Sequence, residues 1–230
     1  MNSFSASPNR RKFLGGSLAL GLGLSAFFTT RGAFAEQLAR TPRLEEGPFY
    51  PPKLPLDTDN DLIVINDSLT PAVGEITHVS GRILGANGEP LRNAVVEIWQ
   101  CDSKQLYLAQ GPGPGRGDAN FQGFGRFLTG STGEYYFRTI KPVPYPGRTP
   151  HIHFKVKKGR TELLTTQLFI KDYAQNARDM VFRRLRQASE RDLVSSDFKP
   201  LEGSKVGELS AHFDIVLGLT PADADEKTRR

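Results

Sequence analysis

The stretch EITHVSGRILGANGEPLRNAVVEIWQC, residues 75–101, decides the fold class. Its two ends, residues 75–84 and 93–101, are rich in β-branched and apolar residues and each has the character of a strand. Between them lies ANGEP, in which Asn-Gly is a strong turn signal. The stretch therefore predicts a β-hairpin or one step of a Greek key.

The same alternation of short strands and turns continues to the end of the chain. GRFLTGSTGEYYFRTI (125–140) predicts two strands around a Gly-Ser-Thr-Gly turn, HIHFKVK (151–157) and ELLTTQLFI (162–170) predict a pair, and SAHFDIVLGL (210–219) predicts a last strand. Only residues 174–192 have apolar side chains at helical spacing. About seven short strands without intervening helices predict an all-β sandwich with long irregular loops and one short helix.

Residues 1–35 have the pattern of an export signal. The arginine pair Arg10–Arg11 precedes an apolar run from Leu14 to Phe28, and Ala-Phe-Ala follows as a small-residue cleavage site ending at Ala35. The run is shorter than the ~20 residues that a spanning helix needs, so we expect a cleaved twin-arginine signal and no stable membrane anchor. The expected partner is the twin-arginine export machinery, and the expected location is the periplasm or the extracellular space.

Composition divides the remaining chain into three parts. Residues 36–74, rich in Pro, Asp and Asn, predict an irregular N-terminal arm, residues 75–220 the β-sandwich domain, and residues 221–230 a flexible C-terminal tail. Within the domain, GPGPGRGDANFQGFG (111–125) is too rich in glycine for a helix or strand, and so long a loop in a compact domain is usually functional.

Charge and cysteine content exclude several classes of protein. Four of the 30 basic residues and none of the 25 acidic ones fall in residues 1–35, which leaves 26 basic against 25 acidic residues. A nearly neutral chain gives no electrostatic reason to expect a nucleic-acid partner. Because Cys101 is the only cysteine, an internal disulfide is impossible, and stability must come from a core.

The stretch YPGRTPHIHF, residues 145–154, carries the chemistry. Side chains alternate along a strand, so His151 and His153 share one face while Ile152 and Phe154 point into the core. Two imidazoles at this spacing can grip one metal ion, although two polar residues on a solvent-facing strand would show the same pattern. Tyr145 favours the metal, because a phenolate is a hard anionic donor suited to a trivalent ion such as ferric iron.

With these residues in place, the chain resembles the intradiol ring-cleaving dioxygenases, the family of the protocatechuate and catechol dioxygenases. The resemblance covers nearly the whole chain after the signal. It is carried by an ordered series of segments: EGPFYPP, GRILGANGEPLRNAVVEIWQCD, YLA, GRFLTGSTGEYYFRTIKPVPYP, RTPHIHFKV, TTQLFI and HFDIVL. It implies the prealbumin-like sandwich of that family and makes residues 75–220 the catalytic domain.

The resemblance also implies a metal centre and a reaction. It makes Tyr107, Tyr145, His151 and His153 the ligands of a mononuclear, non-haem Fe(III) ion. The implied substrates are O2 and a catechol or substituted catechol, whose ring would open between the two hydroxyl-bearing carbons to a cis,cis-muconate-type diacid. Tyr145 would accept a substrate proton.

Two further residues enter through the same resemblance. Arg148 would stabilise negative charge on the ring, and Gln167 would lie beside the bound substrate.

Two departures from the family pattern leave other properties open. Only five residues separate Tyr145 from His151, where protocatechuate dioxygenases have a longer loop with a bulky aromatic residue, so the substrate is not fixed. The long helical N-terminal region through which catechol dioxygenases dimerise is absent, so a homo-oligomer is possible but not implied.

Two alternatives stay open at this point. The stretch GRILGANGEPLRNAVVEIW also resembles prealbumin-like and carboxypeptidase-regulatory domains, which would make the protein a non-catalytic, exported β-sandwich binding module without iron. Alternatively, His151 and His153 alone would hold zinc or copper.

Overall fold

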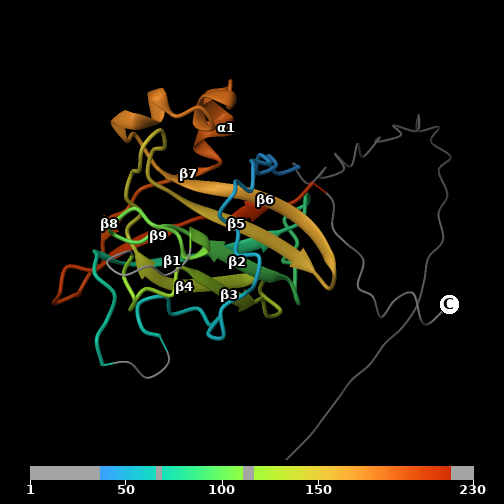
Figure 1. Cartoon of the computed structure of the whole chain (residues 1–230). Coiled ribbons are helices and arrows are strands. Elements are labelled where there is room, and N and C mark those ends of the chain that lie inside the picture. The colour runs from blue at the N-terminus through green and yellow to red at the C-terminus, as the bar shows by residue number, and fades with distance from the viewer. Residues whose placement is uncertain (1–36, 66–68, 111–116, 219–230) are drawn as a thin grey trace, which may run out of the picture. The chain divides into compact units, whose positions relative to one another are not determined.

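The computed structural model describes residues 37–65, 69–110 and 117–218 (Figure 1). The predicted export signal and the predicted C-terminal tail lie outside the described residues, as does the Gly/Pro-rich part of the long loop, residues 111–116. The described strands form two sheets, as the sequence predicts for an all-β sandwich.

The first sheet is built around its longest strand, β1 (Ile76–Leu84). The antiparallel strand β4 (Glu134–Ile140) pairs along one edge of β1. Two short parallel strands, β9 (Leu209–His212) and β10 (Ile215–Val216), pair with β1 at different points along its length. The edge strand β8 (Lys199–Pro200) pairs with β9.

The second sheet carries the candidate site and has the order β3-β2-β5-β6-β7. Its central strand is β5 (His151–Lys158), which lies antiparallel to both β2 (Val95–Trp99) and β6 (Thr161–Ile170). The outer strands are β3 (Phe124–Leu128), antiparallel to β2, and the two-residue β7 (Ser195–Ser196), parallel to β6. The prediction that residues 151–157 and 162–170 form a pair is confirmed.

The stretch 75–101 is a crossing between the two sheets and not a hairpin. Its turn is local, because the Gly88 N–H bonds to the Gly85 carbonyl at 3.0 Å and the Leu91 N–H returns to the Ile83 carbonyl at 2.8 Å. After Leu91 the chain enters β2 in the other layer. Of the two predicted possibilities, the hairpin is therefore wrong. The strands β3 and β4 are divided between the two sheets in the same way.

The main hydrophobic core lies between the sheets. Alternate residues of each strand point inward, so each layer contributes one face of apolar side chains. The first sheet gives Val79, Ile83, Tyr135, Phe137 and Ile140, and the second gives Val96, Ile98, Ile152, Phe154, Val156, Leu164 and Leu168. All of these side chains are buried, so the alternation predicted for β5 is confirmed on its core face.

The single helix predicted over residues 174–192 is wrong in its continuity. The segment contains two 3-10 turns, η2 (Ala174–Arg178) and η3 (Phe182–Arg184), and then the short helix α1 (Ala188–Asp192). Asp179, between the turns, is extended and its carboxylate accepts the N–H groups of the residues that follow, which interrupts a helical hydrogen-bond pattern. Among the described residues, α1 is the only α-helix, and no helix there is long and apolar enough to cross a membrane.

The last predicted strand, 210–219, is likewise divided into β9 and β10. Asp214 lies between them, and its carboxylate accepts the Arg82 N–H at 2.8 Å. Between β9 and β10, the Asp214 side chain therefore accepts the β1 hydrogen bond that a strand carbonyl would otherwise accept.

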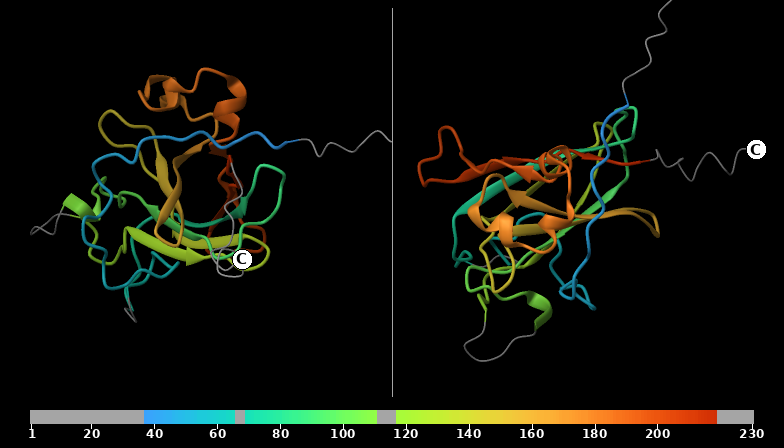
Figure 2. Two further views of the ribbon diagram at one scale, coloured as in Figure 1. Left: turned by 90° about the vertical axis from the view of Figure 1, so that its right-hand side faces the viewer. Right: turned by 90° about the horizontal axis from the view of Figure 1, so that it is seen from above.

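Residues 37–46 of the N-terminal arm run without turns past both sheets (Figure 2). Its Leu38 and Thr41 N–H groups bond to the carbonyls of Ala86 and Val216, each at 3.0 Å. Further along, the Leu44 N–H bonds to the Thr165 carbonyl of β6 at 2.9 Å. These bonds bring residues 45–50 over the outer face of the second sheet.

Candidate metal centre

The centre is built on the outer face of the second sheet, opposite the main core. In the register of the sheet, His153 of β5 lies directly between Trp99 of β2 and Gln167 of β6. Directly paired residues of neighbouring strands point to the same face. The pairing of three strands therefore sets an indole, an imidazole and an amide in one row.

Both histidines are buried, which contradicts a solvent-facing strand. His151 is 2% exposed and His153 is 1% exposed. They are covered by a second, smaller apolar cluster between the sheet and its surrounding loops, which includes Trp99, Phe124 and Tyr107. The sequence alternation gave the correct side of the strand, but it did not reveal that this side is covered.

The two imidazoles converge on one point. His151 Nδ1 lies 2.6 Å from the Thr149 carbonyl oxygen, which can only accept, so Nδ1 carries the proton and Nε2 has a free lone pair. That Nε2 atom is 3.1 Å from His153 Nε2. Burial, with Arg148 nearby, lowers the pKa of His151 to about 3, and burial also lowers the pKa of His153 strongly. Both rings are therefore neutral, as metal ligation requires.

Two tyrosines complete the group. Tyr107, just before the 3-10 turn η1 (Leu108–Gln110), places its Oη 3.3 Å from His151 Nε2. The ring centroids of Tyr107 and Tyr145 are 5.7 Å apart, and that of Tyr145 is 5.6 Å from His151. Burial raises the pKa of both phenols above the ordinary value, so they are neutral at pH 7 unless a strong Lewis acid binds them.

The loop between Tyr145 and His151 is tightly folded. Tyr145 and Arg148 exchange backbone hydrogen bonds of 3.3 and 2.9 Å, with Pro146 and Gly147 at the turn. Gly147 has φ of 82°, a left-handed conformation that favours glycine. This turn brings the Tyr145 and Arg148 side chains to the same side as the histidines.

Arg148 is held by two side chains. Its Nε donates to the Asp179 carboxylate at 2.8 Å and one terminal nitrogen donates to Gln167 Oε1. The other terminal nitrogen lies 3.5 Å from Tyr145 Oη. The structure therefore brings together all six residues that the sequence singled out, and adds Asp179, which sequence reasoning missed.

The arm closes the centre from outside. Phe49 stacks on the Tyr107 ring with centroids 4.5 Å apart. Gly47 has φ of 71°, and a Cβ at this position would lie 3.5 Å from His153 Cε1. The turn in the arm is thus shaped to lie against the histidine ring.

An ionic network fastens the arm to the sheet. The Tyr50 hydroxyl donates to the buried Glu97 carboxylate at 2.9 Å, and Lys157 Nζ lies 2.8 Å from the same carboxylate. Lys155 lies over the Tyr50 ring at 3.8 Å and pairs with Glu46. The charged side chains of β2 and β5 therefore bind the arm.

The donor set fits a hard trivalent ion. Within the described residues no group of three or more His, Cys, Asp or Glu side chains is placed to hold a metal. The two Nε2 atoms, 3.1 Å apart, are close enough for one ion to contact both. Two neutral imidazoles and two phenol oxygens form a mixed donor set suited to ferric iron.

A separate cavity adjoins Tyr107. It has a volume of about 530 Å³ and is lined on the described part of the chain by residues of the arm and of both sides of the long loop. Leu56, Ile65, Leu106 and Phe121 make it largely apolar. Of the four candidate ligands, only Tyr107 lines this cavity.

The family assignment follows from comparison with known proteins. A family model, Dioxygenase_C, described as "Dioxygenase", matches residues 45–218. The chain belongs to the intradiol dioxygenase family.

Relatives of this family member act on different catechols. The protocatechuate 3,4-dioxygenase β chain of Burkholderia cepacia is 37% identical over 63% of this chain and 65% of its own length. The catechol 1,2-dioxygenase 1 of Acinetobacter lwoffii is 28% identical over 88% of this chain and 70% of its own. The match to the first of these relatives thus spans less than two thirds of that protein.

Solved structures give the same family fold. The dioxygenase domain of a dioxygenase–carbohydrate-binding fusion from Streptomyces sp. SirexAA-E is 29% identical, with a TM-score of 0.58 over 79% of this chain and 99% of that one. Catechol 1,2-dioxygenase from Acinetobacter sp. ADP1 is 25% identical, with a TM-score of 0.60 over 78% of this chain and 63% of that one. The intradiol dioxygenase interpretation is therefore favoured over the binding module.

Proposed function

We propose that this family member is a non-haem Fe(III) dioxygenase that cleaves a catechol or substituted catechol between its two hydroxyl-bearing carbons. The second substrate is O2, and the product is a cis,cis-muconate-type diacid. The observation that carries the proposal is the convergence of His151 Nε2 with His153 Nε2 at 3.1 Å and with Tyr107 Oη at 3.3 Å.

The four donors are Tyr107, Tyr145, His151 and His153. A ferric ion bound to them would supply a Lewis acid that keeps the phenols ionised and draws electron density from a bound catecholate. His151 is held in the ligating tautomer by the Thr149 carbonyl. The buried, apolar surroundings exclude water from the reacting ring, which strengthens every electrostatic interaction there.

Three residues act on the substrate. Tyr145 Oη accepts a proton from a substrate hydroxyl, and its half-buried position gives it access to the bound ring. Arg148, whose side chain is only 15% exposed, keeps a positive charge beside Tyr145 and stabilises negative charge that develops on the ring. Gln167 lies beside the bound substrate and also accepts a hydrogen bond from the Arg148 guanidinium.

The ring substituent that the enzyme accepts is to be found by assaying several catechols. The relatives are named for protocatechuate, catechol and hydroxyquinol. The loop between Tyr145 and His151 has only five residues, and none of them is aromatic. We therefore propose catechol or a substituted catechol as the substrate class.

The proposal extends to the export of the enzyme. Residues 1–35 act as a cleaved twin-arginine signal, residues 36–74 as the arm and residues 75–220 as the catalytic domain. The enzyme then functions in the periplasm or outside the cell. Cell fractionation of the wild type and of a variant with Arg10 and Arg11 both changed to Lys tests this, because the variant should stay in the cytoplasm.

The function is tested by visible absorption followed by oxygen uptake. Iron-loaded protein should be red because of tyrosinate-to-iron charge transfer, and anaerobic catechol should move the band to longer wavelength. Oxygen uptake is then measured with catechol, protocatechuate, hydroxyquinol and gallate. A colourless protein after iron loading, or a red one that consumes no oxygen with any of the four, would overturn the proposal.

A further inference from the structure

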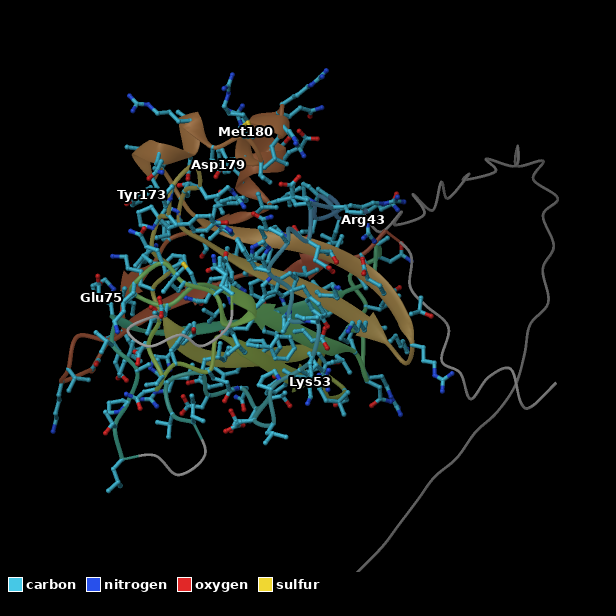
Figure 3. All side chains as sticks on the ribbon, viewed as in Figure 1. Arg43, Lys53, Glu75, Tyr173, Asp179 and Met180 are labelled. Carbon is cyan, nitrogen blue, oxygen red and sulfur yellow. The ribbon has the colours of Figure 1, made fainter. Side chains whose placement is uncertain are left out.

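Asp179 is a buried carboxylate outside the four donors and outside the substrate contacts proposed above. Its side chain is 0% exposed, whereas the side chain of its neighbour Met180 is on the surface (Figure 3). A buried carboxylate is costly unless its oxygens are fully hydrogen-bonded. The contacts of Asp179 therefore show what the fold gains from keeping a charge there.

Four N–H groups donate hydrogen bonds to the Asp179 carboxylate. One oxygen accepts the N–H groups of Val181 and Phe182, both at 2.9 Å, and so is fixed within its own segment. The other oxygen accepts the Thr149 N–H at 2.9 Å and Arg148 Nε at 2.8 Å. Burial alone would raise the pKa of Asp179, but these N–H groups and the guanidinium outweigh it and lower the pKa, so the group is charged.

Half of these bonds reach into the loop that carries the candidate site. With Nε held by Asp179, the two terminal nitrogens of Arg148 are directed at Gln167 Oε1 and toward Tyr145 Oη. Gln167 is itself fixed, because its amide donates to the Glu45 carbonyl at 2.9 Å. A planar guanidinium gripped at one edge has only one orientation left.

The bond from Thr149 links Asp179 to the candidate ligand His151. The Thr149 N–H bonds to Asp179, and the Thr149 carbonyl accepts the proton of His151 Nδ1. The Thr149 hydroxyl bonds to Asn176 of the same segment at 2.7 Å. One carboxylate thus holds both the arginine and the residue that sets the histidine tautomer.

We propose that Asp179 is a positioning residue that orients Arg148 over the substrate ring and anchors the Thr149 peptide behind His151. The catalytic consequence rests on the proposed function, whereas the contact itself does not. The experiment is therefore designed with one readout for each.

The contact is tested by NMR on 15N-labelled protein loaded with Ga(III), a diamagnetic substitute for ferric iron. In the wild type, the Arg148 Nε–H should give a resolved signal that exchanges slowly with solvent, identified by its loss in Arg148→Lys. Fast exchange like that of a surface arginine would overturn the proposal. In Asp179→Asn the exchange should accelerate at least 10-fold.

The catalytic consequence is tested by a double-mutant cycle. Asp179→Asn should keep wild-type iron content, because the amide oxygen can still accept the Thr149 N–H behind His151. The value of kcat/KM should fall about 10- to 100-fold, most of it in kcat, because an amide cannot hold the guanidinium as a charge does. In the Arg148→Ala background the same change should cost less than about 3-fold. Equal losses in both backgrounds would show that Asp179 does not act through Arg148.

A matched control and a second variant complete the design. Asp214→Asn removes a carboxylate that also holds an arginine and a backbone N–H, those of Arg82, but in the other sheet, and should leave kcat/KM unchanged. If Asp179→Asn fails to fold, Asp179→Glu takes its place. It keeps the charge but changes the length of the side chain, so the Arg148 Nε–H should exchange faster than in the wild type and kcat/KM should fall. Wild-type kcat/KM together with fast exchange would overturn the proposal. A slowly exchanging Arg148 Nε–H in a protein without oxygen uptake would reject the proposed function and leave the contact established.

Discussion

Trp99 lies flat against His153, with ring centroids 4.8 Å apart and an interplanar angle of 8°. The edge of Tyr50 meets the same indole at 5.0 Å and 86°. The imidazole is therefore backed by an indole that Tyr50 holds in place, and neither of these two residues is among the four proposed ligands. Such backing reduces the freedom that a ligand would lose on binding a metal.

Replacement of Trp99 by Leu should therefore weaken iron binding. We expect an affinity lower by about 10-fold and a free energy of unfolding lower by about 3 kcal/mol. Iron titration and urea unfolding measure the two effects. Phe124→Leu, in the same cluster but without a ring contact to His153, is the control and should lower stability alone.

The two tyrosines should each contribute to the colour of the iron-loaded protein. Tyr107→Phe and Tyr145→Phe each remove one phenol oxygen, so each should weaken the visible band and lower iron affinity roughly 10- to 100-fold. Tyr136→Phe is the control, because this half-exposed tyrosine bonds to His78 in the other sheet. An unchanged spectrum in both site variants would exclude phenolate ligation.

Arg148→Ala should slow the reaction without removing the metal. The loss of one preorganised charge beside the reacting ring should lower kcat about 100- to 1,000-fold. Iron content measured on the same sample should match the wild type. A variant purified without iron would instead show that Arg148 supports the loop and not the transition state.

The ion cluster of Glu97 should make stability depend on pH. Burial alone would raise the pKa of Glu97, but hydrogen bonds from Lys157, Arg126 and Tyr50 outweigh it and lower the pKa. A lowered folded-state pKa contributes stability above the unfolded value near 4.5, and this contribution disappears as pH falls through the folded value.

Glu97→Gln should accordingly lower the free energy of unfolding by about 2 kcal/mol at pH 7, with the difference from wild type shrinking below pH ~4.5. Urea unfolding at several pH values measures it. Glu75→Gln removes an exposed pair with Lys141 and should cost less than about 0.5 kcal/mol at any pH. A deficit of Glu97→Gln that persists undiminished at pH 3 would contradict the expected linkage.

The contact between β1 and the C-terminal strands leaves no space at Gly81. A Cβ there would lie 2.0 Å from the Phe213 carbonyl oxygen, so Gly81→Ala should lower the free energy of unfolding by about 3 kcal/mol. A Cβ at Gly130 would meet nothing within 4 Å, so Gly130→Ala is the control and should be nearly neutral. Similar stabilities of the two variants would contradict the close approach.

Most strands could be predicted because each has a local signal. The alternation around His151 assigned Ile152 and Phe154 to the core correctly. The pairing of strands was harder to predict, since the turn after β1 looks the same whether the chain stays in one sheet or crosses to the other. The helix over 174–192 was wrong because apolar spacing does not reveal that a buried carboxylate, Asp179, interrupts it.

The site, too, has residues with a local sequence signal and residues without one. Tyr145, His151 and His153 lie in one short stretch, whereas Tyr107 and Arg148 were predicted through the family resemblance, and the structure brings all five together. The backing of His153 by Trp99 depends on the register of two strands that are more than 50 residues apart, which no local pattern encodes. Asp179 has no motif of its own, and only its contacts with Arg148 and Thr149 indicate its role.

The crossing of the arm over β6 also bears on how copies of this molecule behave toward one another. The β7 strand pairs with β6 only at Phe169 and Ile170, and Leu44 takes up the free edge at Thr165. An open strand edge is a template for another chain, so unblocked sandwiches tend to associate edge to edge. Proteolytic loss of the arm would therefore expose a surface prone to polymerisation, so one segment both encloses the site, through residues 47–50, and covers the strand edge, through Leu44.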